Sequence, residues 1–333
     1  MLICGDISLP NKKSIDYSSI PRDLCKKRWF GNLEGSIIDK NGDELKNELK
    51  NSGVFNSYEA IFELKKHIDF SLFSLANNHI LDKSSIHSTR SNLEKLGVAY
   101  VGAGYNSVDA ARHVDVLDEN EETYTILAFG WDCIGCKYAK KNQQGVNPII
   151  KKHVIEEVRK IKQHSRKIIC FFHWNYELEL YPQPYERSLA KLLIDEGVYA
   201  VIGCHSHRVQ GIEFYKGKPI VYGLGNFLFQ QRVYFDGKLE FPDYSSDELV
   251  FELGGNGSFS VHKFKYDKSQ NTLYFVKSIL NINPNENFEG KAVFSGYSDE
   301  DYQIFFKRNR VKKKLLPIFR YNESQLEYML KTK

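Results

Sequence analysis

Two patterns of apolar and polar positions alternate along the first two-thirds of the chain. Short runs rich in β-branched and aromatic residues predict buried strands at residues 2–4, 70–75, 99–101, 124–129, 167–172, 200–202 and 219–222. Between these runs, apolar residues recur at helical spacing, which predicts helices at residues 57–67, 85–96, 148–164 and 184–196. Strands that alternate with helices in this way are typical of an α/β protein.

The pattern changes after about residue 227. Residues 249–280 read LVFELGGNGSFSVHKFKYDKSQNTLYFVKSIL, which predicts antiparallel strands joined by Gly/Asn and Lys-Ser-Gln-Asn turns. A helical pattern returns from about Asp299 and contains the basic run KRNRVKKK at residues 307–314. We interpret this run as a solvated helix face, with a patch for an anionic polymer or a membrane surface as the alternative. The chain is therefore expected to form one domain at residues 1–235 and a β-rich, then helical, extension at 236–333 packed on it.

Composition and charge restrict the classes of partner and compartment. The chain has 46 Lys and Arg against 42 Asp and Glu, and so small a surplus favours no nucleic-acid partner. We find no signal-peptide pattern and no run of roughly 18 apolar residues, so we expect no integral membrane segment and a cytoplasmic protein. The six cysteines fit buried thiols in a reducing compartment. Cys133 and Cys136 form a CxxC pair that we interpret as coincidence, rather than as half a zinc site or a redox pair.

Metal-capable side chains follow several of the predicted strands. The segments are LICGD, ending in Asp6; FSLANNH, ending in Asn77, Asn78 and His79; IICFFHW, with His173; and AVIGCHSH, with His205 and His207. Ligands of open α/β sheets bind at the carboxyl ends of the strands. Any one of these residues alone would be a cap or a satisfied core group, but together they indicate a metal pocket. An extended segment would project His205 and His207 to the same side.

The segment WFGNLEG supplies a further carboxylate. We expect Asn32 and Glu34 to lie in a turn between Gly31 and Gly35, where close backbone approach would aim Glu34 inward. The alternative is an ordinary solvent-exposed loop.

The ordered series GD, NLE, ANNH, HW, GxHxH and KPIVYGLGNFLFQ, over residues 2–231, resembles the CapA family. These are capsule and poly-γ-glutamate synthesis proteins of the calcineurin-like metallophosphoesterase superfamily. The resemblance implies a four-layer α/β/β/α sandwich with two divalent metal ions at one edge of the sheets. It also implies that His79 protonates the leaving oxygen, that Glu34 bridges the metals, and that the other ligands are Asp6, Asn78, His173, His205 and His207.

Three positions depart from the family pattern. Ser8 stands where many superfamily phosphatases have a histidine, which would weaken the first metal position. Asn175 replaces a glycine after the HW pair, although Glu177 can fill the acidic position that follows. Ser206 replaces a proline between the two late histidines. We expect these changes to affect metal occupancy and substrate fit more than the fold.

The predicted ligands are oxygen and imidazole donors without a thiolate, which suits Mn²⁺, Fe or Zn²⁺. A histidine at position 79 suits a general acid because its pKa lies near neutrality, with packing or ligation as the alternative. Candidate substrate contacts are Asn32, Glu177, Arg208 and Asn226, although a surface arginine or a turn-forming asparagine is an ordinary alternative.

The sequence thus predicts a metal-dependent phosphatase or phosphodiesterase. Its substrate would be a phosphorylated sugar, polyol or polymer intermediate of capsule or surface-polysaccharide synthesis. The alternative is a non-hydrolytic accessory protein of polymer synthesis, whose pocket holds an anionic polymer end. The native metal, the exact substrate and the oligomeric state stay open.

Overall fold

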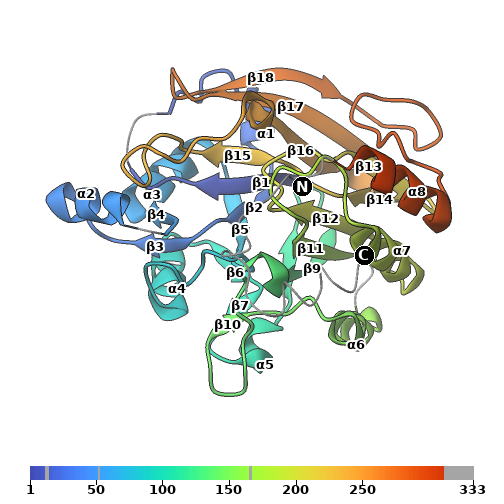
Figure 1. Cartoon of the computed structure of the whole chain (residues 1–333), viewed down its shortest axis with the longest axis horizontal. Coiled ribbons are helices and arrows are strands. Elements are labelled where there is room, and N and C mark those ends of the chain that lie inside the picture. The colour runs from blue at the N-terminus through green and yellow to red at the C-terminus, as the bar shows by residue number, and fades with distance from the viewer. Residues whose placement is uncertain (12–14, 52, 165–166, 311–333) are drawn as a thin grey trace.

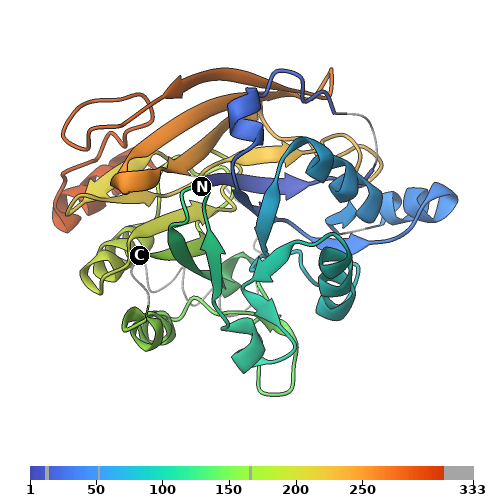
Figure 2. The ribbon, with the colours of Figure 1, turned by 180° about the vertical axis from the view of Figure 1, so that it is seen from behind.

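Two β-sheets pack face to face in the computed structural model, which describes residues 1–11, 15–51, 53–164 and 167–310 (Figure 1). The strand order of the first sheet is β18-β17-β16-β1-β2-β5-β6, with β15 also paired to β1. The strand order of the second sheet is β13-β14-β12-β11-β9-β8. Strand β6 at one edge of the first sheet lies next to β8 and β9 of the second, so the sheets approach each other along that side (Figure 2).

The strands of the first sheet are β1 (Leu2–Ser8), β2 (Trp29–Leu33), β5 (Phe70–Ser74), β6 (Ala99–Val101), β15 (Asn226–Phe229), β16 (Asp247–Leu253), β17 (Phe259–Asp267) and β18 (Thr272–Ile279). Those of the second sheet are β8 (Val114–Leu117), β9 (Thr123–Gly130), β11 (Ile168–His173), β12 (Ala200–Cys204), β13 (Ile212–Tyr215) and β14 (Lys218–Val221). Two small pairs join β3 (Ser36–Ile38) to β4 (Phe55–Ser57) and β7 (Ala103–Gly104) to β10 (Gly145–Val146).

Helices cover the outer faces of the two sheets. Helices α6 (Lys151–Lys162), α7 (Pro184–Asp195) and α8 (Asp299–Asn309) share one apolar cluster with residues of β9, β11, β12 and β14. The remaining helices are α1 (Arg22–Cys25), α2 (Gly42–Lys50), α3 (Tyr58–His67), α4 (Ile86–Lys95) and α5 (Ser107–Ala110). Because helices flank two sheets, the predicted α/β sandwich is confirmed.

Strand β2 extends through Asn32 to Leu33, so placing Asn32 in a turn was wrong, whereas Glu34 and Gly35 do lie in a bend between β2 and β3. Trp29 and Phe30 alternate across the sheet: Phe30 meets Phe171 of the second sheet at 4.7 Å between ring centroids, whereas Trp29 packs against Phe70 at 5.8 Å. Both residues are fully buried, which favours a strand over a solvent-exposed turn. Gly31 permits the close packing, because a Cβ there would lie 2.7 Å from the sulfur of Cys4.

A buried ion pair connects α7 to the segment before α8. The Arg187 side chain is 1% exposed and donates two hydrogen bonds to Glu213 of β13, at 2.9 and 2.7 Å. It also donates to the carbonyl oxygen of Tyr297 at 2.7 Å. This arrangement fixes the chain leading into α8 against the second sheet.

The region after residue 235 continues the first sheet. Strand β16 pairs antiparallel with β1 and is followed by β17 and β18, as the predicted antiparallel pattern required. The division into domains at residues 235 and 236 stays a prediction. Helix α8 confirms the helix expected from Asp299, whereas part of the basic run at 307–314 lies outside the described residues. Over the residues that are described, no helix combines the length and apolarity needed to cross a bilayer.

Candidate metal centre

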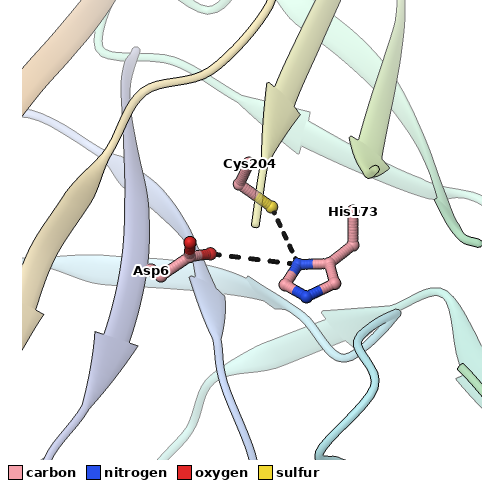
Figure 3. A group of neighbouring side chains, drawn as sticks. All are labelled: Asp6, His173 and Cys204. Carbon is pink, nitrogen blue, oxygen red and sulfur yellow. Dashed lines mark hydrogen bonds and ion pairs between the residues drawn. The ribbon is translucent and has the colours of Figure 1, made fainter. Parts of the chain in front are cut away.

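Parallel register aligns the candidate ligands at neighbouring strand positions. Asp6 on β1 lies beside Asn32 of β2 and Asn226 of β15. On the second sheet, the last residue of β11, His173, pairs with Cys204 of β12. The two sheets bring these sets together, because Nδ1 of His173 lies 3.9 Å from Oδ1 of Asp6 (Figure 3).

Asp6 is fully buried and is held by neutral donors. The amide of Asn32 donates to its Oδ1 at 2.8 Å, and the backbone N–H of His205 donates to its Oδ2 at 3.0 Å. Burial raises the pKa of Asp6, whereas nearby His207 and the hydrogen bond from Asn32 oppose that rise. The structure thus places Asn32, a predicted substrate contact, directly against a predicted ligand.

Glu34 has two carboxylate oxygens with no hydrogen-bond partner among the described residues, although its exposure is only 1%. Its Oε1 lies 3.7 Å from Nε2 of His207 and 3.8 Å from Nε2 of His79. Burial raises the pKa of Glu34 well above its usual value, and the negative charge of Asp6 raises it further. A buried carboxyl group without partners is unfavourable in the metal-free protein and is well suited to bind a cation.

Asn77 organises the loop that carries Glu34. Its amide donates to the carbonyl oxygen of Leu33 at 2.8 Å, and its Oδ1 accepts the N–H groups of Gly35 and His79, both at 3.2 Å. Gly35 adopts φ +89°, and a Cβ there would lie 2.4 Å from the carbonyl oxygen of Val54. The close backbone approach predicted for Gly35 is therefore present, and Asn77 connects it to the loop that follows β5.

The next two side chains of that loop face different groups. Oδ1 of Asn78 lies 2.8 Å from Nε2 of His173. His79 hydrogen-bonds through Nδ1 to Oδ2 of Asp82 at 2.6 Å, which leaves its Nε2 on the side of Glu34. Sequence reasoning missed Asp82, although its position three residues after His79 was a usable signal.

His173 is fully buried and contacts polar atoms through both ring nitrogens. Nε2 lies 3.1 Å from Nδ1 of His205, while Nδ1 lies 3.1 Å from Sγ of Cys204. Burial lowers the pKa of His173 well below its usual value, and the neighbouring histidines His207 and His79 lower it further. A neutral imidazole is the form that binds metals.

The two late histidines converge, but not through an extended segment as predicted. His205 has φ +88° and His207 has φ +49°, so both adopt left-handed backbone. Such backbone is strained in residues other than glycine and is concentrated at functional sites. Nδ1 of His207 pairs with Oδ1 of Asn226 at 2.8 Å, and its ring packs 4.4 Å from Phe241. Asn226, a predicted substrate contact, therefore adjoins a predicted ligand.

Two buried groups of side chains could each hold a cation: Asp6, His173 and Cys204, and Glu34, His205 and His207. Within each group, one donor atom per residue lies within 4.8 Å of the others. The chemistry of these donors fits a divalent metal ion. Cys204 was missing from the sequence-based ligand set, because a cysteine in an apolar run resembles a core residue.

Five further residues named from the sequence have the following surroundings. Ser8 bonds to the hydroxyl of Tyr234 at 2.5 Å, so its side chain is engaged away from Asp6. Oε1 of Glu177 lies 3.9 Å from Nε2 of His207, and the Glu177 side chain is 53% exposed. Arg208 stacks on Tyr244, with Cζ 4.2 Å from the ring centroid. Cys133 and Cys136 are both buried, and neither forms a disulfide bond.

The chain is thus a mixed α/β protein with two candidate cation-binding groups where its sheets meet. The family model for the bacterial capsule synthesis protein PGA_cap matches residues 25–231. The chain therefore belongs to this family, which confirms the resemblance drawn from its motifs.

Curated relatives and solved structures give further similarities. The chain is 33% identical over 235 residues to the PGA biosynthesis protein CapA of Bacillus subtilis (strain 168), covering 69% of this chain and 59% of that protein. It is 28% identical over 228 residues to the capsule biosynthesis protein CapA of Bacillus anthracis, covering 67% and 52%. The match thus spans between half and three-fifths of these relatives. A putative 5'-nucleotidase structure from Staphylococcus aureus aligns with TM-score 0.46 and 12% identity, over 92% of this chain and 57% of that one.

Proposed function

We propose that this chain is a metal-dependent phosphoesterase, a phosphatase or phosphodiesterase. Its substrate would be a phosphorylated sugar, polyol or polymer intermediate of capsule or surface-polysaccharide synthesis. The observation that carries the proposal is Glu34, a buried carboxyl group without hydrogen bonds that lies between His79 and His207. This geometry supports a cation site at Glu34, next to His79, whose Nε2 faces Glu34.

Two divalent ions would supply a nucleophilic water and neutralise charge on the phosphoryl oxygens. Six side chains would hold the ions: Asp6, Glu34, Asn78, His173, His205 and His207. The chain orients these groups before any ligand arrives. Asn32 fixes Asp6 and Asn226 fixes His207, which restricts the carboxylate and the imidazole to the geometry described above.

His79 would donate a proton to the leaving oxygen. Asp82 accepts a hydrogen bond from Nδ1 of His79 in the tautomer that this role requires, and so holds Nε2 toward the centre. The His79 side chain is 29% exposed, so it is reachable by both substrate and solvent. Proton donation by a positioned histidine contributes about 10²–10⁴ in rate.

A cavity of about 500 Å³ lies beside Asp82, the hydrogen-bond partner of His79. It is lined by Leu81, Asp82, Lys83, Ser84, Ser85, Lys137, Gln143 and Gln144. Hydroxyl, amide and ammonium groups in this lining suit a polyhydroxylated or anionic group better than an apolar one.

The test is hydrolysis of an aryl phosphate monoester and diester by protein loaded with Mn²⁺, Fe²⁺ or Zn²⁺. His79→Asn is expected to lower kcat by about 10²–10⁴ and to leave the bound metal unchanged. His87→Asn is the matched control, because His87 is an exposed histidine that pairs with Tyr105. A folded, metal-loaded protein without turnover on any monoester or diester would refute the proposal.

The names of the two Bacillus relatives favour a second candidate, a non-hydrolytic accessory protein of polymer synthesis. The centre would then hold an anionic end of the growing polymer. This candidate predicts metal-dependent binding of poly-γ-glutamate or a phosphorylated sugar without turnover. Isothermal titration alongside the hydrolysis assay separates the two.

A further inference from the structure

Cys204 points its sulfur at the side of His173 that also faces Asp6 (Figure 3). The Cys204 side chain is 1% exposed, and its Sγ lies 3.1 Å from Nδ1 of His173. Oδ1 of Asp6 lies 3.9 Å from the same nitrogen. The three donor atoms come from β1, β11 and β12, so their spacing is fixed by both sheets rather than by one flexible loop.

The tautomer of His173 leaves a lone pair between these groups. The amide oxygen of Asn78 only accepts hydrogen bonds, and it lies 2.8 Å from Nε2 of His173. Nε2 must therefore carry the hydrogen, and Nδ1 has the lone pair. That lone pair lies 3.1 Å from the sulfur of Cys204 and 3.9 Å from Oδ1 of Asp6. The amide nitrogen of Asn32 lies at the edge of this group, 3.4 Å from Nδ1 and 2.8 Å from Oδ1 of Asp6.

Two further observations indicate that a cation belongs here. Glu34 in the neighbouring group is 1% exposed, and neither of its carboxylate oxygens has a hydrogen-bond partner in the described part of the chain. In addition, Ser8 occupies the position where many related phosphatases have a histidine ligand. Its hydroxyl is not available to a cation beside Asp6, because it bonds to Tyr234 at 2.5 Å and to the carbonyl oxygen of Phe55 at 3.4 Å. Cys204 is the side chain that completes a set of three around Asp6.

We propose that Cys204 supplies a sulfur ligand, together with Asp6 and Nδ1 of His173, to a thiophilic divalent ion. The inference rests on the metal centre of the proposed function and specifies its metal. A thiolate selects Zn²⁺, Fe²⁺ or Co²⁺ over Mg²⁺ and Mn²⁺, which prefer oxygen donors. Binding breaks the S–H bond, forms a metal–sulfur bond and releases one proton to solvent.

Cobalt absorption tests the sulfur ligand directly. The metal-free protein of 333 residues is titrated with Co²⁺, and the near-ultraviolet band of thiolate-to-cobalt charge transfer is recorded. The band is expected in the wild-type protein and absent in Cys204→Ser, with Co²⁺ affinity at least about tenfold weaker. Cys170→Ser is the matched control, because Cys170 is a fully buried cysteine of β11 in the cluster packed against the helices. Thermal unfolding of each variant verifies that it is folded.

X-ray absorption of the zinc-loaded protein gives a second readout that needs no variant. A zinc–sulfur distance of about 2.3 Å supports the inference. Stoichiometric Co²⁺ binding by the wild-type protein without the band would overturn it, as would a band that persists in Cys204→Ser and disappears in Cys136→Ser. If the protein hydrolyses phosphate esters but shows no thiolate-to-cobalt band, the sulfur ligand is refuted and the phosphoesterase proposal stands. If the band is present but no ester is hydrolysed, the phosphoesterase proposal is refuted and the sulfur ligand stands.

Discussion

Replacing Glu34 by glutamine separates the unfavourable burial of this carboxyl group from its proposed role in binding a cation. The side chain is 1% exposed, and no hydrogen bond from the described residues reaches its two oxygens. Burial and the charge of Asp6 raise its pKa well above the usual value. Glutamine has nearly the same shape but no charge, so the substitution removes the acid and keeps the packing.

In metal-free protein, Glu34→Gln is expected to leave stability unchanged or to raise it by up to about 2 kcal/mol. A buried polar group without partners costs about 1–3 kcal/mol, and the amide retains part of that cost. The sign depends on pH. Because the pKa of Glu34 is raised in the folded state, its stabilising contribution is complete below the unfolded pKa of about 4.3 and is lost as pH rises through the folded pKa. The advantage of glutamine therefore grows as pH rises above the unfolded pKa.

With metal bound, the wild-type protein is expected to be more stable than Glu34→Gln. A ligand present at 100 times its Kd stabilises the folded state by about 2.7 kcal/mol. Neutral glutamine binds a divalent cation more weakly, so the variant should lose most of this increment. A difference of this size moves Tm by several degrees, since 1 kcal/mol corresponds to about 2–4 °C in chains of 150–250 residues and to less in longer ones.

The assay is thermal and urea unfolding at pH 6 and pH 8, with either a chelator or Zn²⁺. Glu186→Gln is the matched control: Glu186 is 2% exposed, its oxygens also lack partners among the described residues, and burial raises its pKa to about 8. Without metal, the stability of Glu186→Gln relative to the wild-type protein should depend on pH in the same direction. With Zn²⁺, this control should keep the full metal-induced increase in Tm. A role for Glu34 in binding a cation is refuted if Glu34→Gln keeps the full Zn²⁺-induced increase in Tm. The unfavourable burial of Glu34 is refuted if the substitution destabilises the metal-free protein at pH 8 by more than about 2 kcal/mol.

Three other substitutions test separate parts of the structure. Asp82→Asn should lower kcat less than His79→Asn, because Asp82 orients the His79 ring and does not itself donate the proton; steady-state kinetics with metal analysis check this. Asn77→Ala should cost about 1–3 kcal/mol and weaken metal binding, since one side chain joins Leu33, Gly35 and His79; urea unfolding and Zn²⁺ titration measure both effects. Arg187→Ala should cost about 3–5 kcal/mol in urea unfolding, because it leaves a buried carboxylate unpaired. An unchanged midpoint for Arg187→Ala would contradict that assignment.

The regular elements were predictable because their periodic signals are long and strong. Strand β6 matches its predicted bounds, and α7 ends at Asp195, one residue short of the prediction. Strand β2 was missed because Gly31, Asn32 and Gly35 are turn-forming residues. Tertiary packing overrides that local preference, since Trp29 and Phe30 each need an apolar layer on opposite faces.

The convergence of the candidate ligands was predictable, but their local geometry was not. Side chains at the carboxyl ends of parallel strands share one edge of a sheet, and that rule was sufficient to group Asp6 with the later histidines. The left-handed backbone at His205 and His207 has no local signal, because neither position is a glycine. Likewise, nothing near Ser8 indicates that its partner is Tyr234, 226 positions away in the sequence.

The placement of Cys204 depends on strand register, which a single sequence does not specify. Strands β11 and β12 pair so that His173 lies opposite Cys204 and Phe172 lies opposite Gly203. A slip of one residue would put Gly203 beside His173 and turn the cysteine to the other face of the sheet. The space beside Gly203 holds this register, because a Cβ there would lie 2.2 Å from Nε1 of Trp174. The packing of Trp174 against a glycine thus determines whether the sulfur of Cys204 reaches the candidate metal centre.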